Sequence, residues 1–325
     1  MKPSLLIIFA VAVFASCQHK PQYTYLEGEA QGTTFRIVYE GTQDLSSSVD
    51  SLFRVIDHSM SLWDSTSIIS KLNANQTGVK ADLHFALVFQ KSQQIAKITE
   101  GAFDITVGPL VKTWGFSYKK GLPFPTQKQT DSLLKLIDYR KVRLENGIFI
   151  KANPHIEIDF NAIAQGYTVD VMADFLKSNN SQNYLVEIGG EVRAQGKNEK
   201  GQLWKIGIDK PTNQEASGRP LQAVVALNNK SLATSGSYRK FVERNGKKYS
   251  HAIDPKTGLP ITHQLLSISV IANDCMTADA YATAFLVMGL EKAKPLAQQL
   301  QLEWYGIYAL PNGQIKAASS SHFFE

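Results

Sequence analysis

Cysteine is scarce in this sequence of 325 residues, which contains only Cys17 and Cys275. An acylated Cys17 would leave a single thiol, and that would exclude an intramolecular disulfide. Cys275 lies in an apolar stretch and is more typical of a small buried residue than of a nucleophile. The stability of the chain must therefore come from its hydrophobic core.

Common signatures of nucleotide and nucleic-acid binding are also missing. Neither GxGxxG nor GxxxxGK[ST] occurs, which argues against a Rossmann or P-loop nucleotide site. The formal charge of +5 is spread along the chain, and no basic run is interleaved with aromatic residues. We therefore expect no nucleic-acid partner.

The first twenty residues, MKPSLLIIFAVAVFASCQHK, have the pattern of a secretory signal, with one Lys before the apolar run Leu5–Phe14. That run is too short to cross a bilayer about 30 Å thick. The stretch FASC resembles a lipobox, in which a peptidase cuts before an acylated Cys17, although Leu is commoner than Phe at its first position. We predict a signal peptide at residues 1–16 and a lipid-anchored tether at residues 17–24; a plain signal peptide cut near Ala15 is the alternative.

The remaining sequence mixes helical and β-type patterns. Apolar residues at helical spacing predict helices over residues 49–60 and 85–98. The second half contains the β-type runs RLENGIFIKA, with an Asn-Gly turn, HIEIDF, NYLVEIG, LWKIGI, QAVVAL and SISVIA. Helical stretches at about 165–178 and 275–301 interrupt them. Because no regular βαβ repeat, internal repeat or long linker occurs, we predict an α+β fold with antiparallel-type sheets in one compact domain at residues 25–325.

The stretch DCMTADAYATAFLVMG has the pattern of a buried helix that is interrupted by Asp279 and Thr283. A spacing of four places their oxygens on one helix face. Because burying an unpaired carboxylate costs several kcal/mol, Asp279 needs a partner. Two hard oxygens on one face suit Mg²⁺. The alternatives are a salt bridge from Asp279 to a Lys or Arg, and a bond from the Thr283 hydroxyl to the carbonyl four residues earlier.

His251 opens the stretch HAIDPKTG, where a strand meets a polar turn. The Asp-Pro pair and the final Gly are ordinary turn residues. A histidine in this place can act as a general base or can be a core histidine with satisfied hydrogen bonds, and the residue pattern alone favours neither reading.

Eight segments, in order, resemble the FAD:protein FMN transferases, the ApbE-like flavin transferase family. They are QGTTF, MSLWDSTSIISKLN, TEGAFDITVGPLVKTWGF, IDFNAIAQGYTVD, YLVEIGGEVRAQG, LATSGSYRKF, SHAIDPKTGLP and TADAYATAFLVMG. They extend from about residue 28 to 290. The resemblance implies a T-fold-like α+β architecture and a Mg²⁺-dependent enzyme that moves FMN from FAD onto a Thr or Ser of a target protein, with release of AMP.

The resemblance also implies roles for single residues. Asp279 and Thr283 match two side-chain metal ligands, and the backbone carbonyl of Ala162 matches a third. His251 matches a histidine beside the reacting diphosphate, where it would accept a proton or orient the nucleophile. Flavin contacts are implied for Trp63, Ala102, Phe103, Asp104, Asp159, Gln165 and Ile253.

Three positions depart from the family pattern: Gln31 stands where Met is usual, Trp63 where Tyr is common, and Gln165 where Lys or Glu is usual. Trp63 can still stack on a flavin or adenine ring. Gln165 removes a charge beside the diphosphate or ribose. This change leaves open a Mg²⁺-dependent FAD pyrophosphatase that forms FMN and AMP. A non-catalytic FAD-binding lipoprotein is a further alternative, but storage would require neither the metal pair nor His251.

The resemblance finally implies partners and a location. The acceptor would carry an Asp/Ser-Gly-x-Thr-like motif, as subunits of membrane redox complexes often do. The chain would be a membrane-anchored lipoprotein that faces the periplasm, with the inner membrane favoured by the resemblance. Gln18 replaces the Asp that commonly retains lipoproteins there, which leaves the outer membrane open.

Overall fold

The computed structural model describes residues 21–116, 123–211, 220–238, 241–244 and 247–325, and only the backbone of residues 241–244 and 247–248. The predicted signal peptide at residues 1–16 and the predicted lipid anchor Cys17 lie outside these ranges. Within them, none of the helices combines the length and the apolar character needed to cross a bilayer.

An eight-stranded sheet runs through the centre of the molecule in the order β1-β2-β5-β6-β9-β12-β13-β14, and all its neighbouring strands are antiparallel. Its strands are β1 (Tyr23–Ala30), β2 (Thr33–Glu40), β5 (Tyr184–Ile188), β6 (Glu191–Gln195), β9 (Ser231–Gly236), β12 (Leu265–Ala272), β13 (Glu303–Ala309) and β14 (Ile315–Ser319). Antiparallel strands combined with helices confirm the predicted α+β class.

Three hairpins lie outside the central sheet in the described residues, in addition to an isolated bridge between Ile253 and Pro260. They are β3 (Val142–Glu145) with β4 (Ile148–Lys151), β7 (Trp204–Asp209) with β8 (Leu221–Leu227), and β10 (Phe241–Arg244) with β11 (Lys247–Ser250). The predicted Asn-Gly turn joins β3 to β4, with φ of 51° at Asn146 and 77° at Gly147. Positive φ at both central residues is the geometry that suits a two-residue hairpin loop.

The helices are α1 (Ser46–Met60), α2 (Ile68–Asn73), α3 (Leu83–Ile98), α4 (Gly108–Thr113), α5 (Gln127–Leu134), α6 (Ala164–Ser178), α7 (Cys275–Met288) and α8 (Leu290–Gln299), with short 3₁₀ turns at Ile105–Val107 and Tyr139–Lys141. The predicted helices at 49–60, 85–98 and 165–178 are confirmed as parts of α1, α3 and α6. The predicted helical stretch at about 275–301 is confirmed as two helices, α7 and α8. Gly289 has φ 77° and ψ 159°, a conformation that a helix cannot continue through, and it separates α7 from α8.

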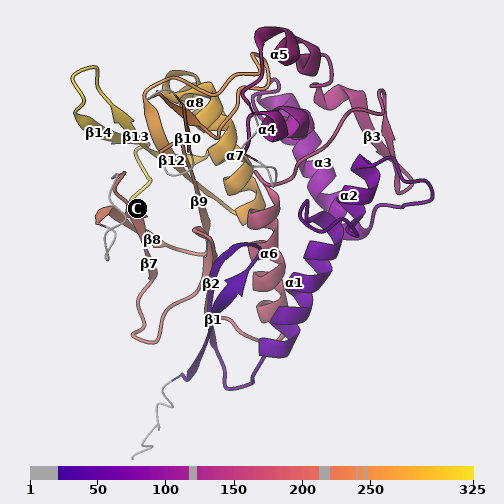
Figure 1. The fold of residues 1–325 in the computed structure, drawn as a ribbon. Coiled ribbons are helices and arrows are strands. Elements are labelled where there is room, and N and C mark those ends of the chain that lie inside the picture. The colour runs from indigo at the N-terminus through magenta and orange to yellow at the C-terminus, as the bar shows by residue number, and fades with distance from the viewer. Residues whose placement is uncertain (1–20, 117–122, 212–219, 239–240, 245–246) are drawn as a thin grey trace, which may run out of the picture.

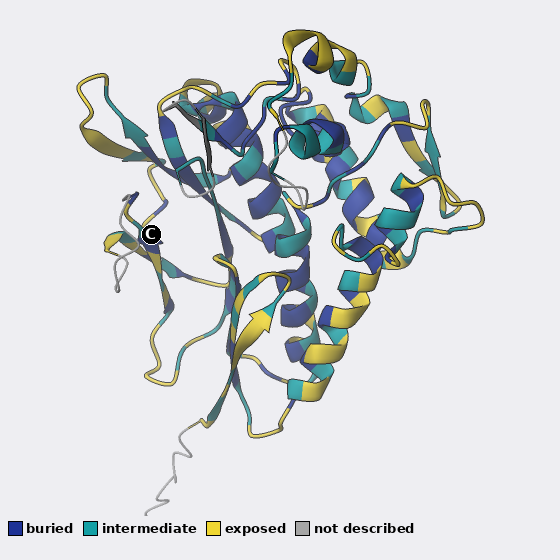
Figure 2. Cartoon of the chain, in the orientation of Figure 1, coloured by how far each residue is buried: buried dark blue, intermediate teal, exposed yellow. Residues whose placement is uncertain are grey.

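Helices cover one face of the central sheet and a hairpin covers the other. α6 lies against β5 and β6, while α7 lies against β9 and β12; α1 and α3 form an outer layer (Figure 1). The β7–β8 hairpin and Phe323 pack on the opposite face. Figure 2 shows that α6 and α7 are buried along much of their length. Cys275, at the start of α7, is fully buried and burial raises the pKa of its thiol well above the usual value, which confirms its predicted packing role.

Candidate active site

Helices α6 and α7 meet at Gly166 without room for a side chain. A Cβ atom at this position would lie 2.4 Å from the carbonyl oxygen of Cys275 and 2.8 Å from Cβ of Asp279. The Gly166 N–H donates to Oδ2 of Asp279 at 3.0 Å. The close approach therefore places the first turn of α6, which follows Ala162, against the carboxylate of Asp279.

Replacing Gly166 with Ala tests this contact, because helix propensity and packing predict opposite changes in the free energy of unfolding. Propensity alone favours Ala by up to about 1 kcal/mol. The overlap with Cys275 and Asp279 should instead lower the free energy of unfolding by about 1–3 kcal/mol. Urea denaturation measures the change, with the exposed α6 substitution Lys177→Ala as the control. A Gly166→Ala chain more stable than the wild type would contradict the packing.

Asp279 is buried without a basic partner. Its residue is 6% exposed, and no Lys, Arg or His within the described ranges forms an ion pair with it. Burial raises the pKa of its carboxyl group to about 7, the Gly166 N–H opposes this rise, and the charge of Asp170 adds to it. The salt-bridge alternative is therefore wrong for the described residues. A buried carboxylate with one hydrogen-bond donor still lacks a counter-charge.

Thr283 lies one turn further along α7, and its Oγ1 is 2.9 Å from Oγ of Ser235 on β9. The hydroxyl is thus bonded across to the sheet, whereas the alternative read from the sequence was a bond to the carbonyl of Asp279. Ser235 was not singled out from the sequence, although it lies inside the family-like segment LATSGSYRKF. The pair of hydroxyls lies on the same side of α7 as Asp279.

The donor set at this junction fits a hard divalent cation. The carboxylate of Asp279 and the hydroxyls of Thr283 and Ser235 are oxygen donors, which Mg²⁺ prefers, and the resemblance implies the backbone carbonyl of Ala162, four residues before Gly166, as a further ligand. In the described part of the chain, no group of three or more His, Cys, Asp or Glu side chains is arranged to hold a metal ion. An ion at Asp279 would therefore depend on hydroxyl, backbone, water or substrate oxygens to complete its coordination.

The start of α7 is fixed by a carboxylate from α6. Asp170 accepts the N–H groups of Cys275 and Met276 at 2.9 and 2.8 Å, and Arg193 on β6 donates to it at 2.9 Å. Burial raises the pKa of Asp170 to about 6, while the two N–H groups and Arg193 oppose the rise. Because Asp279 follows Cys275 by about one turn, this cap sets its position. Asp170 was not singled out from the sequence, although it ends the family-like segment IDFNAIAQGYTVD.

The side chain of Gln165 forms a hydrogen bond within the protein. Its Nε2 donates to the carbonyl oxygen of Ile188, the last residue of β5, at 2.8 Å. A Cβ at Gly189, where φ is 65°, would lie 1.8 Å from that nitrogen and 3.0 Å from Cγ2 of Thr33. Glycine suits this position because of its positive φ, and a side chain here would displace the Gln165 amide from the Ile188 carbonyl. The segments QGTTF, IDFNAIAQGYTVD and YLVEIGGEVRAQG converge here.

Two segments with implied flavin contacts lie side by side. The Asp159 N–H donates to the Ile105 carbonyl at 2.8 Å, next to Ala102, Phe103 and Asp104. Asp104 is buried, and its carboxylate accepts from the N–H and hydroxyl of Thr106 and from the N–H of Tyr139. The carboxylate thus fixes the local turn, although burial still raises its pKa. Burial also raises the pKa of Asp159, whose Oδ1 accepts the N–H of Asn161 at 2.7 Å.

His251 and Ile253 lie at the start of the loop that follows β11. Ile253 is 5% exposed and packs with Leu110 and Trp114, so its side chain belongs to a local core. The partly buried ring of His251 contacts Phe116 edge-on, with ring centroids 6.4 Å apart. Trp114 donates through Nε1 to the carbonyl of Gly258 at 2.9 Å, which holds this loop against α4.

Trp63 lies in the loop between α1 and α2, where its residue is 65% exposed. An exposed indole is free of core packing and can stack on a ring system. Its placement differs from that of Phe103 and Ile253, which are buried.

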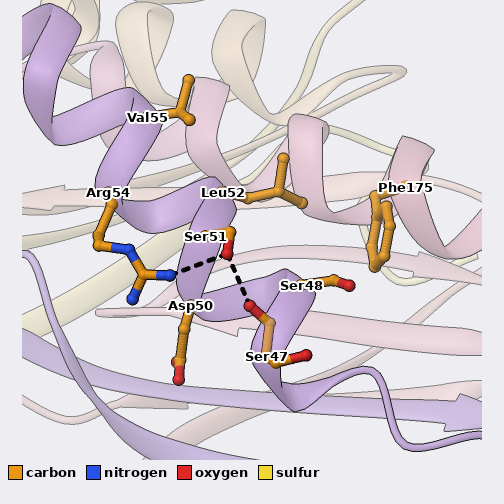
Figure 3. Close-up of a pocket in the computed structure, with 8 residues that line it drawn as sticks. All are labelled: Ser47, Ser48, Asp50, Ser51, Leu52, Arg54, Val55 and Phe175. Carbon is orange, nitrogen blue, oxygen red and sulfur yellow. Dashed lines mark hydrogen bonds between the residues drawn. The ribbon is translucent and has the colours of Figure 1, made fainter.

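An open pocket of about 520 Å³ lies elsewhere, on the solvent side of α1 (Figure 3). Its lining includes Arg54, which donates to Ser51, and Phe175 near the end of α6. Phe175 is nine residues along α6 from Gly166, a separation of about 14 Å at 1.5 Å per residue. The pocket is therefore not part of the Asp279 site.

The fold is that of a known family. The model of the ApbE family matches residues 31–305, so the chain belongs to the ApbE family. It is 38% identical to the FAD:protein FMN transferase of Haemophilus influenzae, over 99% of this chain and 97% of that protein, and 33% identical to the enzyme of that name in Escherichia coli K12, over 93% and 91%.

Solved structures agree with this assignment. The flavin transferase ApbE from Vibrio cholerae superposes with a TM-score of 0.83 at 33% identity, over 93% of this chain and 98% of that chain. The apo form of the Pseudomonas stutzeri flavinyl transferase ApbE gives a TM-score of 0.83 at 29% identity, over 94% and 97%. The ApbE architecture predicted from the sequence is confirmed.

Proposed function

We propose that this chain is an enzyme that transfers FMN from FAD to a Thr or Ser hydroxyl of a target protein and releases AMP. The observation that carries the proposal is the buried, unpaired carboxylate of Asp279, held on the face of Thr283 at the α6–α7 junction. Relatives that match nearly the whole chain are named FAD:protein FMN transferases, which supports both the donor and the protein acceptor.

The residues divide the reaction between them. The target hydroxyl oxygen forms a bond to the FMN phosphorus, the phosphoanhydride bond to AMP breaks, and the hydroxyl proton needs an acceptor. His251 is the residue assigned to accept that proton or to orient the hydroxyl. Asp279, Thr283 and the carbonyl of Ala162 would hold Mg²⁺, which when bound supplies positive charge for the diphosphate oxygens.

The flavin half of the substrate would lie along the segments that the fold brings together. Asp159 is hydrogen-bonded to the turn that follows Ala102, Phe103 and Asp104, and Gln165 lies beside the end of β5. Buried Phe103 and Ile253 would form walls of the pocket, with contact to FAD through their backbone, while the exposed Trp63 would stack on a ring.

An assay with the purified protein, FAD, Mg²⁺ and an acceptor protein bearing an Asp/Ser-Gly-x-Thr-like motif tests the proposal. FMN attached to the acceptor supports the transferase. FMN and AMP formed at the same rate with and without acceptor would support a FAD pyrophosphatase, which is the alternative that Gln165 leaves open. Binding without any product would mean that the chain only binds FAD.

Anchoring at the membrane belongs to the same proposal. The lipobox-like stretch FASC supports acylation of Cys17, with residues 1–16 removed and residues 17–24 as a tether. A periplasm-facing enzyme anchored in this way would meet acceptors in membrane redox complexes. β1 begins at Tyr23, so the strand overlaps the last two residues of the predicted tether and the folded domain starts two residues before the predicted boundary at residue 25.

The pKa of Asp279 predicts how Mg²⁺ binding depends on pH. In the metal-free chain this pKa is about 7, against an ordinary value of 3.8. Below pH 7 the cation must displace a proton, so its apparent affinity should fall about tenfold per pH unit there and become constant above pH 8. Titration of the intrinsic tryptophan fluorescence with MgCl₂ between pH 5.5 and 8.5 measures this. An affinity that does not change below pH 7 would contradict Asp279 as a ligand.

The raised pKa of Asp279 also makes the stability of the metal-free chain depend on pH. Because the folded pKa of Asp279 is raised, its protonated form stabilises the fold fully below about pH 3.8, and this contribution is lost as pH rises through 7. All other titrating groups are the same in the wild type and in the Asp279→Asn chain. When the midpoint of thermal unfolding is measured against pH, the variant should therefore lack this part of the pH dependence.

A further inference from the structure

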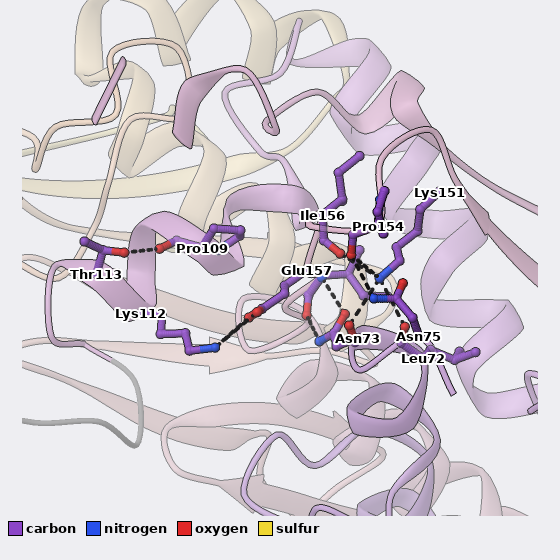
Figure 4. Close-up of polar contacts among 11 residues, drawn as sticks. Leu72, Asn73, Asn75, Pro109, Lys112, Thr113, Lys151, Pro154, Ile156 and Glu157 are labelled. Carbon is purple, nitrogen blue, oxygen red and sulfur yellow. Dashed lines mark hydrogen bonds and ion pairs between the residues drawn. The ribbon is translucent and has the colours of Figure 1, made fainter. Parts of the chain in front are cut away.

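The structure places one lysine ammonium inside a cage of backbone carbonyls. Lys151 ends β4, and its Nζ donates to the carbonyl oxygens of Leu72, Asn73 and Pro154 at 3.2 Å each, and to that of Ile156 at 2.9 Å (Figure 4). Four carbonyl oxygens converge on an ammonium that has only three hydrogens to donate. The geometry resembles the oxygen shell of a monovalent cation, with the cation tethered to the chain.

The four carbonyls come from two segments that are distant in sequence. Leu72 and Asn73 form the end of α2, where carbonyls of a last helical turn attract cations. Pro154 lies in the turn that follows β4, and Ile156 follows that turn, where its N–H donates to the Asn153 carbonyl at 3.1 Å. The ammonium therefore joins α2 to the residues that lead directly into Asp159.

The same stretch is held by further polar contacts. The side chain of Asn73 accepts the N–H of Ile158 and donates to its carbonyl, both at 2.9 Å. On the other side, Lys112 of α4 pairs with Glu157 at 3.1 Å, and a Cβ at Gly108 would lie 2.9 Å from the carbonyl oxygen of Glu157. Residues 156–159 are thus fixed between α2 and α4.

This fixed stretch leads into the proposed site. Asp159 is bonded to the Ile105 carbonyl, and Ala162 follows it by three residues, at the turn before α6. Any displacement of residues 156–159 would be passed to both. Aromatic packing also joins β4 to this region, since Phe149 lies against Phe85 and Phe85 lies against Phe160. The ammonium adds a polar tie from the end of β4 to α2 and to the residues that precede the site.

We propose that Lys151 is a positioning residue that acts as a tethered cation: it holds the stretch 154–158 against α2 and thereby sets Asp159 and the carbonyl of Ala162. This proposal rests on the proposed function, because it concerns the FAD and Mg²⁺ site. It assigns Lys151 no contact with substrate. Removing the ammonium leaves four carbonyl dipoles that face one another without a positive charge, and a small free cation can fill that space.

The test uses the Lys151→Ala chain with ammonium or methylammonium chloride, and tetramethylammonium chloride, which is too large for the cage, as the salt control. We expect the MgCl₂ concentration for half-maximal turnover to rise about tenfold, as for other groups that orient metal ligands. Ammonium should restore it at least several-fold in Lys151→Ala and leave the wild type unchanged. Lys141→Ala is the matched control, because Lys141 donates to a single carbonyl, that of Lys135.

A second measurement does not depend on turnover. In the metal-free Lys151→Ala chain, ammonium should raise the midpoint of thermal unfolding above that in tetramethylammonium, and Lys151→Met, which also lacks the charge, should respond in the same way. An unchanged half-saturation by MgCl₂, or a destabilised chain that does not respond to ammonium, would overturn the proposal. If the wild type bound FAD but transferred no FMN, the proposed function would fail, and the ammonium-dependent midpoint would still decide the role of Lys151.

Discussion

Replacing Asp279 with Asn is expected to lower Mg²⁺-dependent FMN transfer about 10³-fold. An amide keeps an oxygen that can accept the Gly166 N–H, so the α6–α7 contact should survive. It removes the one carboxylate of the proposed metal site. A cation that polarises phosphoryl oxygens contributes several kcal/mol to the transition state, and about 4 kcal/mol corresponds to a 10³-fold change in rate.

The measurement is initial rate against MgCl₂ concentration at saturating FAD. Asp174→Asn is the matched control. Asp174 lies on α6, the helix that packs against α7, but its side chain is 66% exposed and paired with Arg193. Binding of FAD, followed by its fluorescence, should change much less than the rate. An Asp279→Asn chain with the rate of the wild type would show that α7 is only packed, and the mechanism would be wrong.

Replacing His251 with Ala should lower transfer by about 10²–10⁴-fold, the usual contribution of a general acid or base. The ring stands against Phe116 at the edge of the loop held by Trp114, so its loss should leave the core in place. Because a base acts on the hydroxyl proton, the loss should fall on kcat more than on KM for FAD. Single-turnover rates across pH, in wild type and variant, measure this.

Phe116→Leu is the control for the ring contact, because it alters the surroundings of His251 and keeps the imidazole. It should retain most of the activity. A His251→Ala chain that binds FAD and modifies its acceptor at the wild-type rate would remove His251 from the mechanism.

Much of the fold followed from the sequence because its periodicities were clear. The helical spacing of apolar residues located α1 and α3, and the Asn-Gly dipeptide located the β3–β4 turn. The β1–β2 hairpin was missed in a half of the chain that looked helix-rich. Its turn at Gln31-Gly32 has φ of 53° and 74°. Because a positive φ is uncommon for Gln, the residue type gave no indication of this turn.

The run HIEIDF shows why a correct pattern can give a wrong element. Ile156 and Ile158 are buried in alternation, as in a strand, but these residues form no strand. The N–H and carbonyl of Ile158 are bonded to the side chain of Asn73, which takes the place of a neighbouring strand. Partners that are distant in sequence and made by side chains cannot be read from periodicity.

The proposed site residues could be predicted from the sequence, but the residues that hold them in position could not. Asp279 stood out because a carboxylate in an apolar helix demands a partner, and the structure leaves it buried without a basic one. Asp170, Ser235 and Lys151 were not singled out, since each acts through a contact more than 40 residues away in the sequence. Tertiary capping of this kind has no local signal.

The most direct test of the account is the intact mass of the acceptor protein after incubation with this chain, FAD and Mg²⁺. The account predicts that the acceptor gains the mass of one FMN, that one AMP appears for each FMN attached, and that replacing the acceptor Thr with Ala prevents both. FMN and AMP released in equal amounts while the mass of the acceptor stays unchanged would contradict it.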